Sequence, residues 1–275
     1  MTKKITGSIY ITDLAAQTKG LYIGGCSASH ITAIDPRTWN NNVKNNLITL
    51  NLDDTNFVNP PDISKLVNLE RLSISGDIKN GVMTSLPDIT LLTALKFFNI
   101  SQQPGITTLP SGYFDTNILL EEIVMNGNSF AALPDDIFKY NVNLKVLDLG
   151  GNSITVASLK SSLLETNVKL THFDLSDNSL VVNQANPLLT SLFEKNVKLS
   201  AVYLQDNNIA FLSHFQFQHN LLLSKLDMTG DQNEFRSLTT CPTNYYRTQI
   251  FMPSIESGKN FETKKKEIFW ISVFH

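Results

Sequence analysis

Asparagine side chains recur along the middle of this chain at nearly regular intervals. Asn128, Asn152, Asn178 and Asn207 follow one another at 24, 26 and 29 residues, by subtraction of their numbers. An amide side chain has two N–H donors and one carbonyl acceptor, so it can satisfy backbone groups that lose their partners where a strand leaves its sheet. We therefore expect these four residues to form an interior hydrogen-bonding ladder, one for each turn of a coiled chain.

Side chains that support catalysis or metal binding are not grouped in the same way. No Gly-rich phosphate loop is present, and neither Cys26 nor Cys241 stands next to a plausible base. The histidines show no metal-ligand spacing: His30, His172, His214, His219 and His275. We expect no enzymatic activity, no cofactor and no metal site.

The asparagines belong to a repeated pattern of apolar residues. Its first apolar position falls at Leu47, Leu69, Leu95, Leu120, Leu144, Leu170, Leu199 and Leu223. The second and third positions are Leu50/Leu52, Leu72/Ile74, Phe98/Ile100, Ile123/Met125, Leu147/Leu149, Phe173/Leu175, Val202/Leu204 and Leu226/Met228. Because the second and third positions alternate with polar residues, each unit predicts a short strand with one buried face. A divergent unit with Leu21 and Ile23 precedes them.

A second cassette precedes each strand with constant spacing. It pairs Phe114 with Asn117, Phe138 with Asn141, Leu164 with Asn167, Phe193 with Asn196 and Phe217 with Asn220. We expect the aromatic residues to stack as a hydrophobic spine, and the asparagines to cap the chain or turn it back into the next strand.

The segment from Leu170 to Leu180 fits L-x-x-L-x-L-x-x-N-x-L, and residues 18–240 resemble the leucine-rich repeat superfamily. Leu-Pro pairs ending at Pro110 and Pro134, each followed four residues later by Phe, resemble the ectodomain-type repeats. The resemblance implies an α/β-type leucine-rich repeat solenoid of about 8–9 repeats. It would be a curved right-handed horseshoe with a short-stranded parallel sheet on its concave face, and its role would be protein recognition.

Binding on that face depends on the residues between the leucines, which alternation directs outward. We expect Asp148, Asp174, Tyr203 and Asp227 to form a recognition strip for a basic or mixed partner surface, with Tyr203 as the anchor. An apolar patch of Phe97 and Val124 is a second candidate. Alternatively, the aspartates only keep the strand surface soluble and hydrogen-bond their neighbours.

The charge balance helps to define the class of partner. The 22 basic and 25 acidic residues give a net charge of −3, so the sequence lacks the basic surface that nucleic-acid binding requires. A protein or peptide ligand is expected instead.

The two ends depart from the repeat. We expect residues 1–17 to supply an N-terminal capping strand, residues 18–240 the repeats, and residues 241–275 a non-repeat tail. Basic residues followed by a short apolar run at 264–275 fit the start of a membrane span, a peripheral membrane contact or a tail without function. Membrane association is therefore expected only through this tail or through sequence beyond it.

Two functional classes remain open. The chain is either the ligand-recognition part of a receptor or adhesion protein, or an intracellular scaffold or regulatory subunit of a signalling complex. The repeat type favours an extracellular or cell-surface location. The low cysteine count and the lack of a secretory signal favour the cytoplasm.

Overall fold

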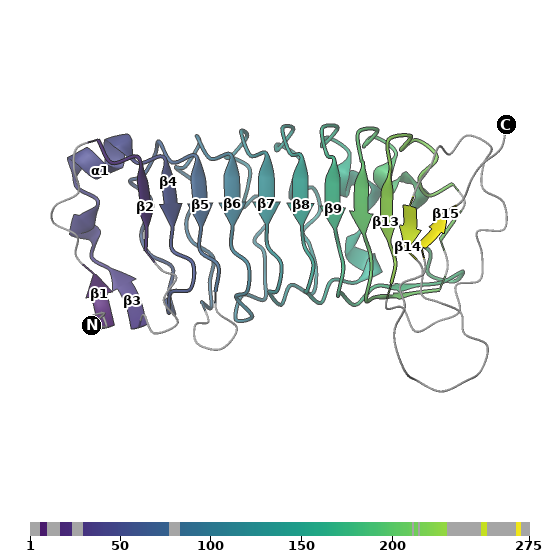
Figure 1. Ribbon diagram of the computed structural model, residues 1–275, viewed down its shortest axis with the longest axis horizontal. Coiled ribbons are helices and arrows are strands. Elements are labelled where there is room, and N and C mark those ends of the chain that lie inside the picture. The colour runs from purple at the N-terminus through teal and green to yellow at the C-terminus, as the bar shows by residue number, and fades with distance from the viewer. Residues whose placement is uncertain are drawn as a thin grey trace.

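The computed structural model describes residues 6–9, 17–23, 30–76, 83–210, 212–213, 215–229, 249–251 and 268–270. Eleven of the described strands lie side by side along the molecule in one long sheet (Figure 1). In spatial order the strands are β2 (Gly20–Tyr22), β4 (Thr49–Asn51), β5 (Arg71–Ser73), β6 (Phe97–Asn99), β7 (Glu122–Val124), β8 (Val146–Asp148), β9 (His172–Asp174), β11 (Ala201–Tyr203), β13 (Lys225–Asp227), β14 (Gln249–Phe251) and β15 (Ile268–Trp270). Neighbours are parallel from β2 to β14, so the stacked turns confirm the predicted solenoid; its horseshoe curvature stays a prediction.

The sheet has the register that the repeats predict. Leu72 of β5 lies opposite Phe98 of β6, and Leu147 of β8 lies opposite Phe173 of β9. The second apolar position of every repeat from β4 to β13 is aligned in this way, and each of these side chains is buried. A slip of one residue would turn the apolar set outward, so burial fixes the register.

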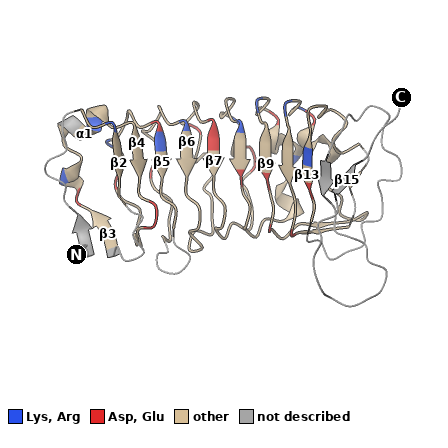
Figure 2. Ribbon diagram, viewed as in Figure 1, with Lys and Arg blue, Asp and Glu red and all other residues tan. Residues whose placement is uncertain are grey.

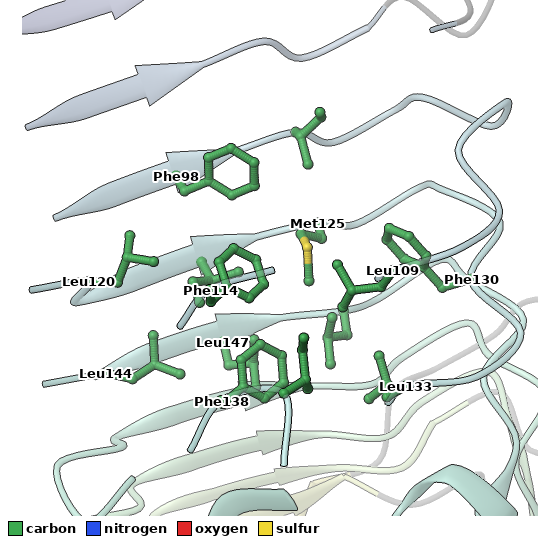
Figure 3. Close-up of a cluster of buried hydrophobic side chains, with 14 of the residues drawn as sticks. Phe98, Leu109, Phe114, Leu120, Met125, Phe130, Leu133, Phe138, Leu144 and Leu147 are labelled. Carbon is green, nitrogen blue, oxygen red and sulfur yellow. The ribbon is translucent and has the colours of Figure 1, made fainter. Parts of the chain in front are cut away.

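Aromatic side chains on the return side pack against the buried face of the sheet (Figure 3). The Phe114 and Phe138 rings stack with centroids 5.8 Å apart, and the Phe193 and Phe217 rings stack at 5.2 Å. Phe114 also meets Phe98 of β6 edge-on at 5.7 Å. The spine therefore joins neighbouring turns to each other and to the sheet.

The four repeat asparagines follow one hydrogen-bonding pattern where the strands end. The Asn152 amide donates to the carbonyls of Met125 and Leu149 at 3.0 and 2.9 Å, while its oxygen accepts from the Phe130 N–H at 3.1 Å. The same pattern joins Asn128, Asn178 and Asn207 to their neighbouring turns. Each amide thus pairs backbone groups of two successive turns.

A second asparagine ladder runs along the return side. The Asn141 amide is fully buried and donates to the carbonyls of Phe114 and Asn117 at 3.2 and 3.0 Å. Equivalent bonds tie each ladder member to the turn before it, and the other members are Asn117, Asn167, Asn196 and Asn220. The constant aromatic-to-asparagine spacing of the sequence reflects this contact.

The residue before each of the four repeat asparagines at the strand ends adopts a left-handed backbone. Gly127 and Gly151 have φ of 65° and 61°, and Asp177 and Asp206 have φ of 49° and 56°. Glycine and aspartate tolerate this conformation better than other residues. Asp177 and Asp206 therefore owe their position at least partly to the turn and not to the strand surface.

The return segments contain turns and short 3-10 helices. The described residues include one α-helix, α1 (Asn41–Asn46), so the α/β name overstates their helix content. The 3-10 helices are Pro36–Thr38, Val156–Ser158, Ser161–Leu164 and Thr190–Phe193. An additional parallel pair, β10 (Val181–Val182) and β12 (Asn208–Ile209), forms where the repeat is longest.

Strands are also present at both ends of the chain. β1 (Thr6–Ile9) pairs with β3 (His30–Ile34) in a separate sheet and does not extend the edge at β2. β14 and β15 extend the main sheet within the segment expected to be a non-repeat tail. Apart from β1, β14, β15 and Gln17, residues 1–17 and 241–275 lie outside the described residues, as do Cys26 and His214. Cys241 and His275 are among the residues not described. No helix in the described part is long and apolar enough to span a membrane.

Candidate functional site: the strand face

The outward side chains of β4 to β13 form a surface that we call the strand face. Its central row holds Asn51, Ser73, Asn99, Val124, Asp148, Asp174, Tyr203 and Asp227, each opposite the next in the sheet register. The predicted strip of Asp148, Asp174, Tyr203 and Asp227 therefore lies on four adjacent strands, with Val124 directly before it. These five side chains are all partly exposed.

Each aspartate of the row uses one oxygen to end its own strand. Asp148 Oδ1 accepts the Gly150 N–H at 3.0 Å, and Asp174 Oδ1 accepts the Ser176 N–H at 2.8 Å. Asp227 bonds the N–H two residues on in the same way. Local bonds of this kind favour Asp and Asn at turns. The aspartates thus have a structural role, as one of the two alternatives expected.

The structural role leaves carboxylate oxygens directed away from the backbone. Asp148 Oδ2 accepts a bond from Asn126 Nδ2 at 3.0 Å. Among the described residues, none donates to the second oxygen of Asp174 or of Asp227. Both carboxylates can therefore accept a hydrogen bond from a ligand without losing their turn contacts.

The N-terminal part of the row is different because its polar groups bond to one another. Asp53 Oδ1 accepts from the Ser73 hydroxyl at 2.6 Å, and Asp53 Oδ2 accepts from Asn51 Nδ2 at 2.7 Å. Asn99 Nδ2 in turn donates to the Ser73 hydroxyl at 2.9 Å. This network uses the side chains internally, so the available acceptors lie mainly at the C-terminal end.

Asp148 and Asp174 are adjacent acids that share one environment. Burial raises the pKa of Asp148 from 3.8 to about 6, the Gly150 N–H opposes this rise, and the charge of Asp174 adds to it. A Cβ atom at Gly150 would lie 3.2 Å from Asp174 Oδ1 and 3.4 Å from Asp148 Oδ1. Glycine therefore leaves the space beside both carboxylates free of a side chain.

A cationic side chain lies over the ring of each of the two aromatic candidates, Tyr203 and Phe97. Lys225 Nζ lies 4.3 Å from the centroid of the Tyr203 ring, and the Arg71 guanidinium carbon lies 4.0 Å from that of Phe97. Phe97 and Val124 do not share a row, because Phe97 stands two residues before Asn99 of the central row and pairs with Glu122. Phe97 and Val124 therefore lie on adjacent strands of the strand face but in different rows.

Sequence reasoning did not assign the second outward row as a set. Its members are Arg71, Phe97, Glu122, Val146, His172, Ala201 and Lys225, one on each strand from β5 to β13. In the sequence, each of these residues stands directly before the second apolar position of its repeat, and this spacing could have identified the row. Together the two rows make one face, with three apolar side chains (Phe97, Val124 and Val146) among polar and acidic ones on β6 to β8, and with mixed charge near β9 to β13.

Charged residues are distributed unevenly across the width of the sheet. Figure 2 shows Lys and Arg near the starts of several strands and acidic residues near the ends of others, while β7 has an acidic start. Two bridges link neighbouring turns near the starts: Lys96 to Glu70 at 2.9 Å and Lys145 to Glu121 at 2.7 Å. The strand starts therefore carry charges of both signs, whereas the ends of β8, β9 and β13 carry aspartates.

The arrangement provides hydrogen-bond acceptors, aromatic area and charge. Within the described ranges, no group of three or more His, Cys, Asp or Glu residues is placed to hold a metal ion.

The repeat geometry has counterparts among known proteins. Residues 118–180 match the family model described as Leucine rich repeat. The chain is a leucine-rich repeat solenoid. Folds of this type are typical of protein–protein interaction modules. No curated protein matches the chain.

Several solved structures share the leucine-rich repeat fold. TLR13 in complex with ssRNA13 matches with a TM-score of 0.61 and 24% identity, over 82% of this chain and 31% of TLR13. The functional domain of InlJ from Listeria monocytogenes, which includes a cysteine ladder, matches with a TM-score of 0.54 and 20% identity, over 86% of this chain and 48% of the InlJ chain. An internalin (inlF) from Listeria monocytogenes strain 4b F2365 matches with a TM-score of 0.56 and 14% identity, over 87% of this chain and 67% of the internalin chain. The chain spans less than half of the first two relatives.

Proposed function

We propose that this leucine-rich repeat solenoid binds a protein or peptide ligand on its strand face, as the recognition part of a receptor or adhesion protein. The observation that carries the proposal is the aligned row of Asp148, Asp174, Tyr203 and Asp227. Tyr203 is a partly exposed residue of a type that is enriched at interface hot spots, and the carboxylates beside it supply hydrogen-bond acceptors. TLR13 and the internalins share the fold, which supports the proposed class.

The proposed ligand carries at least one Arg or Lys. The carboxylates of Asp174 and Asp227 lie on either side of Tyr203 in the row, so a cation can pair with one of them while its aliphatic stem lies on the ring. The same acidic end would repel phosphate groups, so the expectation of a protein ligand and not a nucleic acid is retained.

A peptide-display selection on the purified repeat domain tests this function. Selected peptides should be enriched in Arg or Lys, and their affinity should fall at least about tenfold in a Tyr203→Ala/Asp174→Lys variant. A Phe215→Ala/Asp135→Lys variant is the matched control, because both side chains are exposed outside the strand face. Equal losses in the two variants, or peptides enriched in Asp and Glu, would reject the strip.

A further inference from the structure

Six of the turns that lead into the strands carry an exposed aliphatic residue at one fixed position, which Thr93 occupies in the turn before β6. In each of these turns, the backbone N–H of the first apolar residue bonds the carbonyl three residues earlier, as in Asn141 to Leu144 at 3.0 Å. The residue that follows the one with the accepting carbonyl lies at the tip of the turn. It is Val67, Ile118, Val142, Val168, Val197 or Leu221, each at least 45% exposed.

This position is unusual for such residues. Tight turns favour Gly, Pro, Asn, Asp and Ser, because those residues suit the backbone and tolerate water. Strands about 4.8 Å apart place the five tips from Ile118 to Leu221 along a line of roughly 19 Å. Leu119, Leu222 and Tyr140 add exposed apolar surface beside the line. We call this surface the turn-tip stripe.

We propose that the turn-tip stripe is a self-association surface, on which a second copy of this chain binds in the antiparallel direction. A twofold interface joins the same patch on both copies. If the axis passes between the tips of Val142 and Val168, these two residues meet across it, and Ile118 meets Val197. Every aliphatic tip from Ile118 to Val197 then has an aliphatic partner.

The charges beside the stripe fit that arrangement. Lys139 precedes Val142 by three residues, as Glu165 precedes Val168, so the axis brings Lys139 of one copy near Glu165 of the other. At the outer pair of tips, Asp115 and Glu194 hold the same position, and Lys195, which forms an exposed ion pair with Glu194 at 3.2 Å, offsets their like charges. The arrangement therefore pairs opposite charges at Lys139 and Glu165, and the symmetry repeats that pair.

A lipid surface fits the stripe less well. Beside the tips, the exposed carboxylates of Asp115, Glu165 and Glu194 nearly balance the exposed lysines, which are Lys139, Lys169, Lys195 and Lys198. The surface therefore lacks the large excess of basic residues that attracts a protein to an anionic bilayer. Mixed charge around an apolar line is more typical of a protein interface, which has an apolar centre and a polar rim.

Sedimentation equilibrium over a concentration series tests the proposal. The wild-type chain should be a dimer, and Val142→Lys should weaken dimerisation at least about tenfold, because it places two charges in the apolar line. Val181→Lys is the matched control, since Val181 is equally exposed on β10 and away from the stripe. Circular dichroism would establish that both variants are folded.

Charge reversal supplies a second, independent readout. Lys139→Glu and Glu165→Lys should each weaken the dimer, and the double variant should restore it. The Tyr203→Ala/Asp174→Lys variant should remain dimeric, which separates this surface from the ligand site. A monomeric wild type, a dimer insensitive to Val142→Lys, a double variant without rescue, or stripe-dependent binding to phosphatidylserine vesicles by a monomer would each overturn the proposal.

Discussion

At the residue scale, Asp148 of the strand face both ends its strand with a hydrogen bond and has a raised pKa. Asp148 must sit beside the sheet to accept the Gly150 N–H, and this position partly removes it from water near Asp174. The turn that the residue stabilises therefore makes its ionisation costly.

Asp148→Asn should stabilise the protein at neutral pH. The folded pKa is about 6 and the ordinary value is 3.8, so between these values the folded chain holds a proton that the unfolded chain has released. This contribution to stability is complete below about pH 4 and is lost as the pH rises through about 6. Asparagine keeps an oxygen for the Gly150 N–H and has no charge to bury.

Thermal unfolding at pH 4 and pH 7.5 measures the effect. We expect Asp148→Asn to gain about 1–2 kcal/mol at pH 7.5, allowing for the water that screens this partly exposed group, and little at pH 4. The exposed Asp135→Asn controls for the general loss of one negative charge. A gain that is equal at both pH values would contradict the assignment.

Replacement of a buried asparagine at a strand end should, in contrast, destabilise the protein. Asn152→Ala removes the acceptor of the Phe130 N–H and the donor to Met125 and Leu149, so it leaves buried backbone groups unpaired. Each unpaired group should cost about 1–3 kcal/mol. Urea unfolding should show the loss, while Asn186→Ala, at an exposed asparagine, should change the unfolding free energy little. Equal stability of both variants would refute the ladder.

At the element scale, the strands and the aromatic–asparagine cassette were predictable from the sequence, and the rest of the return segments was not. Burial of Leu72 and Phe98 is dictated by alternation, so the sequence alone predicted the register of β5 and β6. The return side lacks one dominant period, and its tight turns accept many residue types. Neither the β10–β12 pair nor the shortage of α-helix followed from the apolar pattern.

The candidate site was predictable to a similar degree. Alternation places Asp174 and Tyr203 on one face, and the structure has them opposite each other. The sequence did not reveal which carboxylate oxygens are used locally, because that depends on where each strand ends. The bond from the Ser176 N–H to Asp174 is an example.

Backbone conformation gives a testable property of the strand-to-turn junction. Gly151 has a φ of 61°, where β-branched residues are strained and where Asp177 stands in the next turn. Gly151→Val should therefore destabilise the protein by about 1–2 kcal/mol more than Gly151→Asp. Guanidinium unfolding of the two variants measures the difference, and equal destabilisation would show that contact with Gly127, not backbone strain, limits the position.

At the scale of the whole molecule, the repeats convert local rules into extended surfaces. Each turn adds one side chain to the central row and one tip to the turn-tip stripe, so both surfaces grow along the solenoid axis (Figure 1). The strand face and the stripe lie on different sides of the same turns. A dimer formed through the stripe would thus leave two strand faces able to bind ligand, which would raise the avidity for a repeated partner.

The most direct test of ligand binding on the strand face is quantitative affinity capture with three folded proteins: the wild type, Tyr203→Ala/Asp174→Lys, and Phe215→Ala/Asp135→Lys. We expect one set of proteins to be captured by the wild type and by Phe215→Ala/Asp135→Lys, the return-side variant. The same proteins should be lost from Tyr203→Ala/Asp174→Lys, the strand-face variant. If the same proteins are captured by all three, or are lost only from the return-side variant, the strand face is not the binding surface.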